Sequence, residues 1–276
     1  MSTSVVRWSR LAPLCVFLSV VVFGCHPTGQ PGRTPTDTAR AEFTYDRGGI
    51  IRGPRDRKQI ALVFTGGKYG EGATAILDAL GDRGIKASFF VTGDFVRIPD
   101  HQPHLRRIVA EGHYLGPHSD AHPLYCPWED RDQTLVTESA FRADLEKNLA
   151  DLSRYGRTRE QMRCFIPPYE WYNEQIVTWA REMGLVLFNF TPGTRSNADY
   201  MADSDPKFIP SRRIRESILE YESSKPGGLN GFLLLLHLGA GPDRTDKMHP
   251  HVGPLLDELT RRGYSFVRVD EMLGER

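Results

Sequence analysis

From residue 59 onward, short hydrophobic runs alternate with longer amphipathic segments. Most of the hydrophobic runs lack a polar face, which predicts strands buried on both sides, at residues 60–64, 87–91, 114–116, 163–166, 185–190, 231–236 and 265–269. The segments between them place apolar residues at helical spacing, which predicts helices at residues 74–83, 105–110, 141–152, 173–183, 214–221 and 252–262.

Strands that alternate with helices in this way pair in parallel. The unit repeats about seven times over ~215 residues, which favours a closed barrel over an open sheet. The predicted fold is therefore α/β, a deformed (β/α) barrel of about seven parallel strands.

The N-terminus has a different pattern. Arg7 and Arg10 precede a short apolar stretch, residues 11–23, which ends at Gly24 and Cys25. The stretch is short for a membrane span, and V-F-G-C resembles a bacterial lipobox. We predict a lipoprotein-type signal peptide at 1–25 with lipidation of Cys25; an uncleaved transmembrane anchor is the alternative.

The predicted signal sets the domain organisation and the location. Residues 26–50 are rich in Pro, Thr and Gly near their start and predict a flexible tether, and residues 51–276 form the barrel domain. We expect an exported cell-envelope lipoprotein, held to the membrane by a lipid anchor. Export permits a disulfide between Cys126 and Cys164, although two buried thiols fit the sequence equally well.

The overall charge of the chain argues against one class of partner. The chain has 35 basic and 35 acidic residues, so no overall field favours nucleic acid. We expect no nucleic-acid partner.

Polar residues of chemical interest follow directly after the predicted strands: Thr65 with Gly66, His118, Pro168 with Tyr169, Thr191 and His237. The loops after the strands of an α/β barrel build its active site. We therefore expect these residues to share one mouth.

Histidine spacing suggests a metal. His118 and His122 are four apart and could present two imidazoles to one ion, although core histidines give the same spacing. His237 ends an apolar strand, where an acid or base role competes with that of a core histidine. Glu170 lies at a position where a buried carboxylate is costly without a partner.

Other side chains predict contacts with a substrate. Tyr169 and Trp171, beside Trp128, could stack on sugars or could belong to the core. Arg195, Asp199 and Asp246 predict a charged rim, although most charged loop residues are simply solvated.

The order of these motifs resembles the polysaccharide deacetylases, the NodB-homology fold of carbohydrate esterase family 4. The resemblance runs from residue 59 to about 270 through K-A-S-F-F-V-T-G, P-H-S-D-A-H-P, F-I-P-P-Y and L-L-L-L-H. It implies a barrel with one divalent metal, expected to be zinc, held by His118 and His122. It also implies a catalytic His237, an oxyanion held partly by the Tyr169 backbone, and an acetylated polysaccharide or glycan as substrate.

The sequence departs from the family at three positions. The family's T-F-D-D-G motif aligns with residues 63–67, so its general-base aspartate is Thr65 and its metal-ligating aspartate is Gly66. The arginine that orients the base is Ile166. A hydrolase would need a replacement carboxylate, for which we expect Glu170 first, as base or third metal ligand, then Asp120 and Glu71.

Three functions fit the sequence. The first is a metal-dependent hydrolase that removes acetyl groups from a glycan at the cell envelope. The second is a non-catalytic glycan-binding relic of the deacetylase fold, which the missing aspartates favour. The third is a glycan hydrolase that uses Glu170 with a second carboxylate ~5–9 Å away.

Overall fold

A curled sheet forms the frame of the domain in a computed structural model, which describes Met1 and residues 42–274. Its hydrogen-bonded order is β1-β2-β8-β3-β4-β5, with β9 paired to β3. The strands are β1 (Thr44–Asp46), β2 (Gly49–Arg52), β3 (Gln59–Gly66), β4 (Ser88–Val91), β5 (Tyr114–Pro117), β8 (Phe232–His237) and β9 (Ser265–Val267). Strands β3, β4, β5, β8 and β9 are parallel, as predicted.

Two short strands close the curl. Strands β6 (Cys164–Phe165) and β7 (Val186–Leu187) pair in parallel. The Ile166 amide donates to the Pro117 carbonyl at 3.4 Å, and the Asn189 amide donates to the Ile50 carbonyl at 2.8 Å, so β6 reaches β5 and the chain after β7 reaches β2. The predicted deformed barrel is confirmed, but β2 runs antiparallel to β8, so the ring is not parallel throughout.

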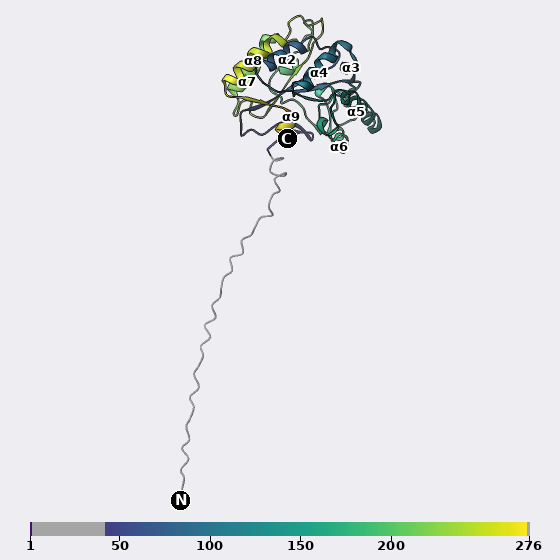
Figure 1. Cartoon of the computed structure of the whole chain (residues 1–276), viewed down its shortest axis with the longest axis vertical. Helices are drawn as coiled ribbons and strands as arrows, with labels where there is room; N and C mark the ends of the chain where they lie inside the picture. The colour runs from purple at the N-terminus through teal and green to yellow at the C-terminus, as the bar shows by residue number, and fades with distance from the viewer. Residues whose placement is uncertain (2–41, 275–276) are drawn as a thin grey trace.

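Helices surround the barrel (Figure 1). They are α2 (Ala73–Gly81), α3 (Gly93–Arg97), α4 (Gln102–Ala110), α5 (Glu138–Ser153), α6 (Glu174–Glu182), α7 (Ser211–Ser224), α8 (His249–Arg261) and α9 (Val269–Met272). Short 3-10 turns are η1 (Pro99–His101), η2 (Glu160–Met162), η3 (Pro168–Glu170) and η4 (Ser196–Ala198). Asn173 caps α6 as predicted, because its Oδ1 accepts the Ile176 amide at 3.1 Å.

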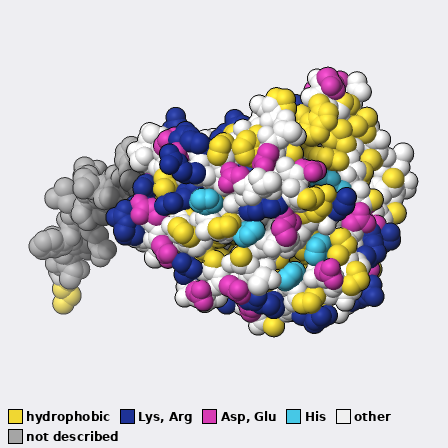
Figure 2. Space-filling view, turned by 90° about the horizontal axis from the view of Figure 1, so that it is seen from above, with side chains coloured by type: hydrophobic (Ala, Val, Ile, Leu, Met, Phe, Trp, Pro, Cys, Tyr) yellow, Lys and Arg dark blue, Asp and Glu magenta, His cyan; other side chains and the backbone are white. Residues whose placement is uncertain are grey.

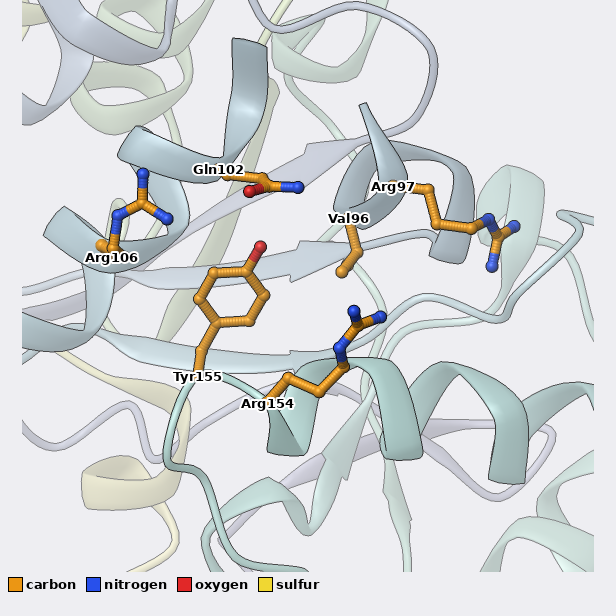
Figure 3. Close-up of a pocket in the computed structure, with 6 residues that line it drawn as sticks. All are labelled: Val96, Arg97, Gln102, Arg106, Arg154 and Tyr155. Carbon is orange, nitrogen blue, oxygen red and sulfur yellow. The ribbon is translucent and has the colours of Figure 1, made fainter. Parts of the chain in front are cut away.

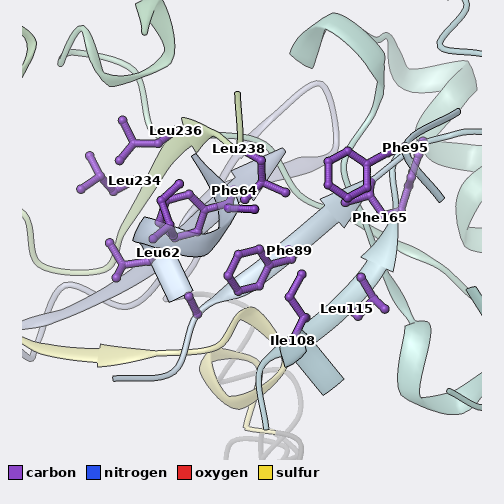
Figure 4. Close-up of a cluster of buried hydrophobic side chains, with 14 of the residues drawn as sticks. Leu62, Phe64, Phe89, Phe95, Ile108, Leu115, Phe165, Leu234, Leu236 and Leu238 are labelled. Atoms are coloured by element: carbon purple, nitrogen blue, oxygen red, sulfur yellow. The ribbon is translucent and has the colours of Figure 1, made fainter. Parts of the chain in front are cut away.

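Strand residues alternate between two hydrophobic cores. Leu62 and Phe64 of β3 face outward and pack under the helices, in the cluster shown in Figure 4. Ala61 and Val63 face inward and fill the barrel interior. This alternation has period two along each strand, so residue 65 also belongs to the inner face.

The hairpin of β1 and β2 corrects the predicted end of the tether. The sequence predicts a tether that extends to residue 50, but residues 44–46 and 49–52 form strands joined by a turn. Arg47 and Gly48 have φ values of 44° and 85°, as a tight hairpin turn of the primed type requires. Arg131 forms an ion pair with Asp46 at 2.8 Å, and the Tyr172 hydroxyl donates to the Asp46 carbonyl at 3.0 Å, which fixes the hairpin to the domain.

The remaining N-terminal predictions concern residues 1–41, of which residues 2–41 lie outside the described part. They include the signal peptide, Cys25 and most of the tether. In the part of the chain that the structure describes, no helix has the length and apolar character needed to cross a membrane.

Cys126 and Cys164 are both buried as thiols and are not joined in a disulfide. Cys126 belongs to the outer core and Cys164 to the barrel interior. Of the two options that the sequence left open, the structure therefore has the buried thiols.

Acidic and basic side chains are mixed on one face of the domain. On the face in Figure 2, histidine, acidic and basic side chains are interspersed with hydrophobic ones. This mixture agrees with the net charge of 0.

Candidate active site

The strand ends place several polar side chains at one end of the barrel. Thr65 of β3 lies opposite His237 of β8, and both continue the inward-facing alternation of their strands. His118 follows β5 and lies on the same inner face. His118, His122 and Glu170 each lie near enough to His237 to interact with it electrostatically. The structure therefore brings these four together.

Thr191 is an exception. Its hydroxyl donates to the Ile51 carbonyl and accepts the Leu233 amide, so it joins β2 to β8. Thr191 was expected among the residues of the mouth. Its hydroxyl instead serves both as a donor and as an acceptor in the closure of the barrel.

His118 is fixed by the ends of two strands. Its Nδ1 donates to the Ile166 carbonyl at 2.8 Å, which leaves Nε2 with a free lone pair. Burial and the neighbouring His122 hold the pKa of His118 well below its usual value. Burial likewise lowers the pKa of His122, to about 4. Both imidazoles are therefore neutral near pH 7, the form that binds metals.

The two imidazoles have the spacing of a shared ligand pair. Their ring centroids are 5.0 Å apart at an interplanar angle of 64°. Two imidazoles that share one zinc at a tetrahedral angle would place their centroids roughly 5 Å apart. The predicted convergence of His118 and His122 is thus geometrically possible.

Strained backbone marks the two loops of this mouth. Among the described residues, five non-glycine residues have positive φ, and four of them lie here: Ser119 (70°), His122 (54°), Tyr169 (58°) and Glu170 (54°). Such conformations are unfavourable for residues other than glycine, and they concentrate at functional sites.

The strained turn places Glu170 near enough to His237 for the two side chains to interact electrostatically. The Glu170 amide donates to the Pro167 carbonyl at 3.0 Å, and Asn189 Nδ2 donates to the Glu170 carbonyl at 2.9 Å. Burial raises the pKa of the Glu170 carboxyl to about 7, with His237 lowering it and Asp199 raising it further. A carboxyl with this pKa exchanges a proton readily near neutral pH.

Asp199 holds His237 at two points. The Asp199 Oδ1 lies 2.7 Å from His237 Nδ1, and Oδ2 accepts the His237 amide at 2.9 Å. Burial alone would lower the pKa of His237, but Asp199 and Glu170 raise it overall. The imidazole therefore keeps a proton on Nδ1 and has Nε2 available for chemistry. This corrects the predicted position of Asp199 on a charged rim, since only 2% of its side chain is exposed.

Aromatic rings form a shelf beside His122. The Tyr169 ring packs against His122 at 4.4 Å between centroids and is tilted by 56°. The Trp128 ring lies 5.7 Å from both Tyr169 and Trp171. Trp128 and Tyr169 are 55% and 45% exposed, so the shelf is open to solvent. Arg131 packs over the ring of Trp171 at 4.4 Å and supports it from behind the shelf. Exposed rings of this kind suit the apolar faces of sugars.

Comparison with known proteins identifies the family. A sequence model of the polysaccharide deacetylase family matches residues 52–188. The chain is 30% identical over 228 residues to the peptidoglycan-N-acetylmuramic acid deacetylase PdaA of Bacillus subtilis, covering 81% of this chain and 74% of that protein. The chain belongs to the polysaccharide deacetylase family.

Other members of the family are more distant or longer. The peptidoglycan-N-acetylglucosamine deacetylase PgdA of Listeria monocytogenes is 27% identical over 223 residues, which cover 80% of this chain but only 40% of PgdA. A crystal structure of a carbohydrate esterase family 4 pseudoenzyme from Bacillus anthracis superimposes with a TM-score of 0.63 at 19% identity, over 83% of this chain and 70% of that one. At this identity the likeness concerns the fold alone.

The family is generally metal-dependent, but the residues present here do not make up its full ligand set. Among the described residues, no three His, Cys, Asp or Glu side chains are grouped so as to hold an ion. A Cβ added at Gly66 would lie 2.9 Å from both Phe95 and Leu238, so the outer core leaves no room there for an aspartate. Thr65 Oγ1 is buried without a hydrogen-bond partner in the described structure and cannot replace a carboxylate.

Two of the three replacement carboxylates serve other contacts. Asp120 is 6% exposed and forms ion pairs with Arg97 and, at 2.7 Å, with Lys147. Glu71 Oε1 accepts the amides of Ala240 and Gly241 and pairs with Lys247. Of the three expected carboxylates, the structure therefore leaves Glu170 available at the mouth.

The remaining predicted rim residues differ from one another. The Asp246 carboxylate accepts the Ser211 amide at 2.6 Å at the start of α7, which is a structural role instead of the predicted contact with substrate. Arg195 is exposed, as expected for a rim residue, and its amide donates to Ser217. Sequence reasoning missed the Asp199–His237 pair, since no local spacing links positions 38 residues apart.

Restoring the family aspartate at Gly66 is expected to damage the fold without creating a metal site. Gly66→Asp should lower the free energy of unfolding by ~1–3 kcal/mol, the usual cost of overpacking a core. Gly67→Asp is the matched control, because a Cβ there meets nothing within 4 Å. Chemical denaturation and zinc content measure both effects. Wild-type stability together with one bound zinc in Gly66→Asp would contradict the packing argument.

Proposed function

We propose that this chain is a hydrolase that removes acetyl groups from a polysaccharide or glycan, with Glu170 as the general base in place of the family aspartate. The proposal rests on the pKa of Glu170, which burial raises to about 7. This carboxyl lies at the same mouth as His237. The relatives named above are peptidoglycan deacetylases, which supports an acetylated amino-sugar glycan as the substrate class.

The chemistry follows from the protonation states. Ionised Glu170 takes a proton from water as the water oxygen attacks the acetyl carbonyl. Protonated His237 donates from Nε2 to the leaving nitrogen, or oxygen in an ester, as its bond to the acetyl carbon breaks. The products are acetic acid and the free amine or hydroxyl, after which Glu170 releases its proton and His237 regains one. Asp199 stabilises the protonated imidazole throughout this cycle.

The aromatic shelf would position the sugar. Exposed Trp128 and Tyr169 provide flat apolar surfaces next to the reacting groups. Stacking there would orient the acetyl group without using the polar residues needed for chemistry.

Zinc, the metal expected from the sequence, would have only His118 and His122 as protein ligands. Catalytic zinc sites usually have three. We therefore expect weak, sub-stoichiometric zinc binding, and the proposed proton transfers use Glu170, His237 and Asp199 alone.

A second candidate is glycan binding without turnover. The specific observation in its favour is that Phe95 and Leu238 leave no space for the third metal ligand. A protein that binds glycans without turnover would still use the aromatic shelf. The third hypothesis, a glycan hydrolase with two catalytic carboxylates, is not supported, since both Asp199 oxygens are bonded to His237.

Acetate release from a glycan panel tests the proposal. The panel contains N-acetylated chitooligosaccharides, peptidoglycan strands and an O-acetylated glycan, with binding to each measured in parallel by calorimetry. Acetate release above that of a His237→Ala variant is expected. Binding of a glycan with no acetate release from any of them would favour the second candidate.

We further propose that the protein is a lipoprotein of the cell envelope, on the basis of V-F-G-C at residues 22–25 and the basic residues before it. Wild-type protein is expected in the membrane fraction, and Cys25→Ser is expected in the soluble exported fraction if signal processing continues. Cell fractionation with labelled fatty acid measures both. Membrane retention of Cys25→Ser without any fatty-acid label would instead indicate an uncleaved helix.

A further inference from the structure

A second cavity lies among the helices outside the sheet and shares no residue with the mouth described above. Its volume is about 320 Å³, within the range of ~300–1,000 Å³ typical of small-molecule sites. We call it the α4–α5 pocket. It is lined by Val96, Arg97, Gln102, Arg106, Arg154 and Tyr155 (Figure 3).

The charged residues that line this pocket are all arginines. Arg97 is neutralised, because it pairs with Asp94 at 2.8 Å, with Asp151 at 3.0 Å and with Asp120. Figure 3 shows its guanidinium turned away from Tyr155. Arg97 therefore shapes the wall of the pocket and is not available to a ligand.

Arg106 and Arg154 are different. Arg106 forms no ion pair with any described residue, and Arg154 has only a 3.3 Å contact with Asp151. In Figure 3 they lie on opposite sides of Tyr155, whose hydroxyl points toward Gln102. Burial raises the pKa of Tyr155 while both arginines lower it, so both cations lie near that hydroxyl. Both side chains are exposed, Arg154 to 70%, so both guanidiniums are accessible to a ligand in this pocket.

The sequence positions these groups on two helices. Gln102 and Arg106 are four apart on α4 and therefore share one face of that helix. Arg154 and Tyr155 follow the last turn of α5. Two rigid elements thus present the cations and the neutral polar groups to the same space.

We propose that the α4–α5 pocket binds a phosphorylated sugar or polyol. Guanidiniums bind phosphate oxygens through paired, charge-assisted hydrogen bonds, so Arg106 and Arg154 would hold the phosphate. The Gln102 amide and Tyr155 hydroxyl would bond the hydroxyl groups, and Val96 would contact a carbon face. The site is independent of the proposed deacetylase chemistry.

Calorimetric titration of the purified protein at low ionic strength tests this with glycerol 3-phosphate, glucose 6-phosphate, inorganic phosphate and glucose. We expect the sugar or polyol phosphate to bind at least ~10-fold more tightly than inorganic phosphate, and glucose not to bind. The double variant Arg106→Gln/Arg154→Gln should weaken binding ~100-fold or more, since each charge-assisted bond contributes about 1.5–3 kcal/mol. Glu170→Gln should bind as wild type, which separates this site from the mouth.

Arg212→Gln/Arg213→Gln is the matched control, because it removes two exposed charges from α7. The proposed site would be wrong if the control weakened ligand binding as much as Arg106→Gln/Arg154→Gln does. It would also be wrong if Arg106→Gln/Arg154→Gln left the affinity unchanged. Inorganic phosphate that binds as tightly as glucose 6-phosphate would overturn the sugar or polyol part. Glycerophosphoglycerol, a phosphodiester, is titrated in the same way. If it binds more tightly than glycerol 3-phosphate, the proposal of a phosphate monoester is wrong, and the ligand is instead part of a polymer or a lipid head group.

Discussion

Glu170→Gln is expected to lower the rate of acetate release by about 10²-fold or more while the protein stays folded. A general base contributes ~10²–10⁴-fold, and glutamine has the same shape but cannot accept the proton of water. Glu170 is the expected carboxylate that remains available at the mouth, since Asp120 and Glu71 are engaged in ion pairs. Acetate release by purified wild type and variant at several pH values measures the effect.

The pH dependence makes this prediction specific. The base must be ionised, so wild-type turnover should fall as the pH drops through about 7, the pKa of Glu170. The acid must be protonated, so turnover should also fall at high pH as His237 loses its proton. Glu170→Gln should lose the acidic limb and keep the alkaline one. A variant that retains full activity with the same acidic limb would show that Glu170 is not the base.

Stability offers an independent check on the same residue. In the folded protein the pKa of Glu170 is raised from 4.5 to about 7, so the folded state holds this proton more tightly than the unfolded state. The free energy of unfolding therefore falls as the pH rises from about 4.5 to about 7. Glu170→Gln should therefore stabilise the protein at pH 8, by at most about 3 kcal/mol, and change little near pH 4. Glu129→Gln, at an exposed carboxylate, is the control and should show neither effect.

The strands of the barrel could be predicted because burial on both faces leaves a strong pattern. The runs at residues 60–64 and 231–236 became the central pair β3 and β8, with Thr65 opposite His237 at their ends. The hairpin at residues 44–52 was missed because its strands are short and its turn depends on backbone conformation at Arg47 and Gly48. Short strands that pair locally leave little periodicity to detect.

The candidate site could be predicted only where its residues end a strand. His118 and the Glu170 turn follow strands, and His237 ends one, so the strand pattern points to all three. Asp199 and Asp246 were indistinguishable in the sequence, because both are acidic residues in polar loops. Tertiary contacts separate them: Asp199 is buried against His237, whereas Asp246 binds the start of α7. The closure of the space beside Gly66 likewise depends on Phe95 and Leu238, which approach from other elements.

Asp199→Asn is expected to reduce acetate release by about 10²-fold or more through its effect on His237. Both carboxylate oxygens accept hydrogen bonds, one from the imidazole and one from the backbone amide of the same residue. Asparagine has only one such oxygen, so its NH₂ group must face one of these donors. The imidazole would then lose its orientation or change its tautomer.

The pKa of His237 distinguishes this effect from a loss of fold. Without the charge of Asp199, burial dominates and should move the pKa of His237 downward, so the alkaline limb of the rate profile should shift to lower pH. Because the raised pKa favours the protonated folded form, the Asp199 pair stabilises most below pH ~6.5, and this contribution is lost as the pH rises through the folded pKa. Asp199→Asn should therefore destabilise the protein more at pH 6 than at pH 9.

Imidazole NMR titration and denaturation at both pH values measure these shifts even if the protein proves to bind glycans without turnover. Asp203→Asn is the control, because Asp203 is exposed and bonds Thr245 on a neighbouring loop. An unchanged His237 pKa in Asp199→Asn would mean that the buried carboxylate does not set the proton affinity of this imidazole, and the proposed acid would then lose its physical basis.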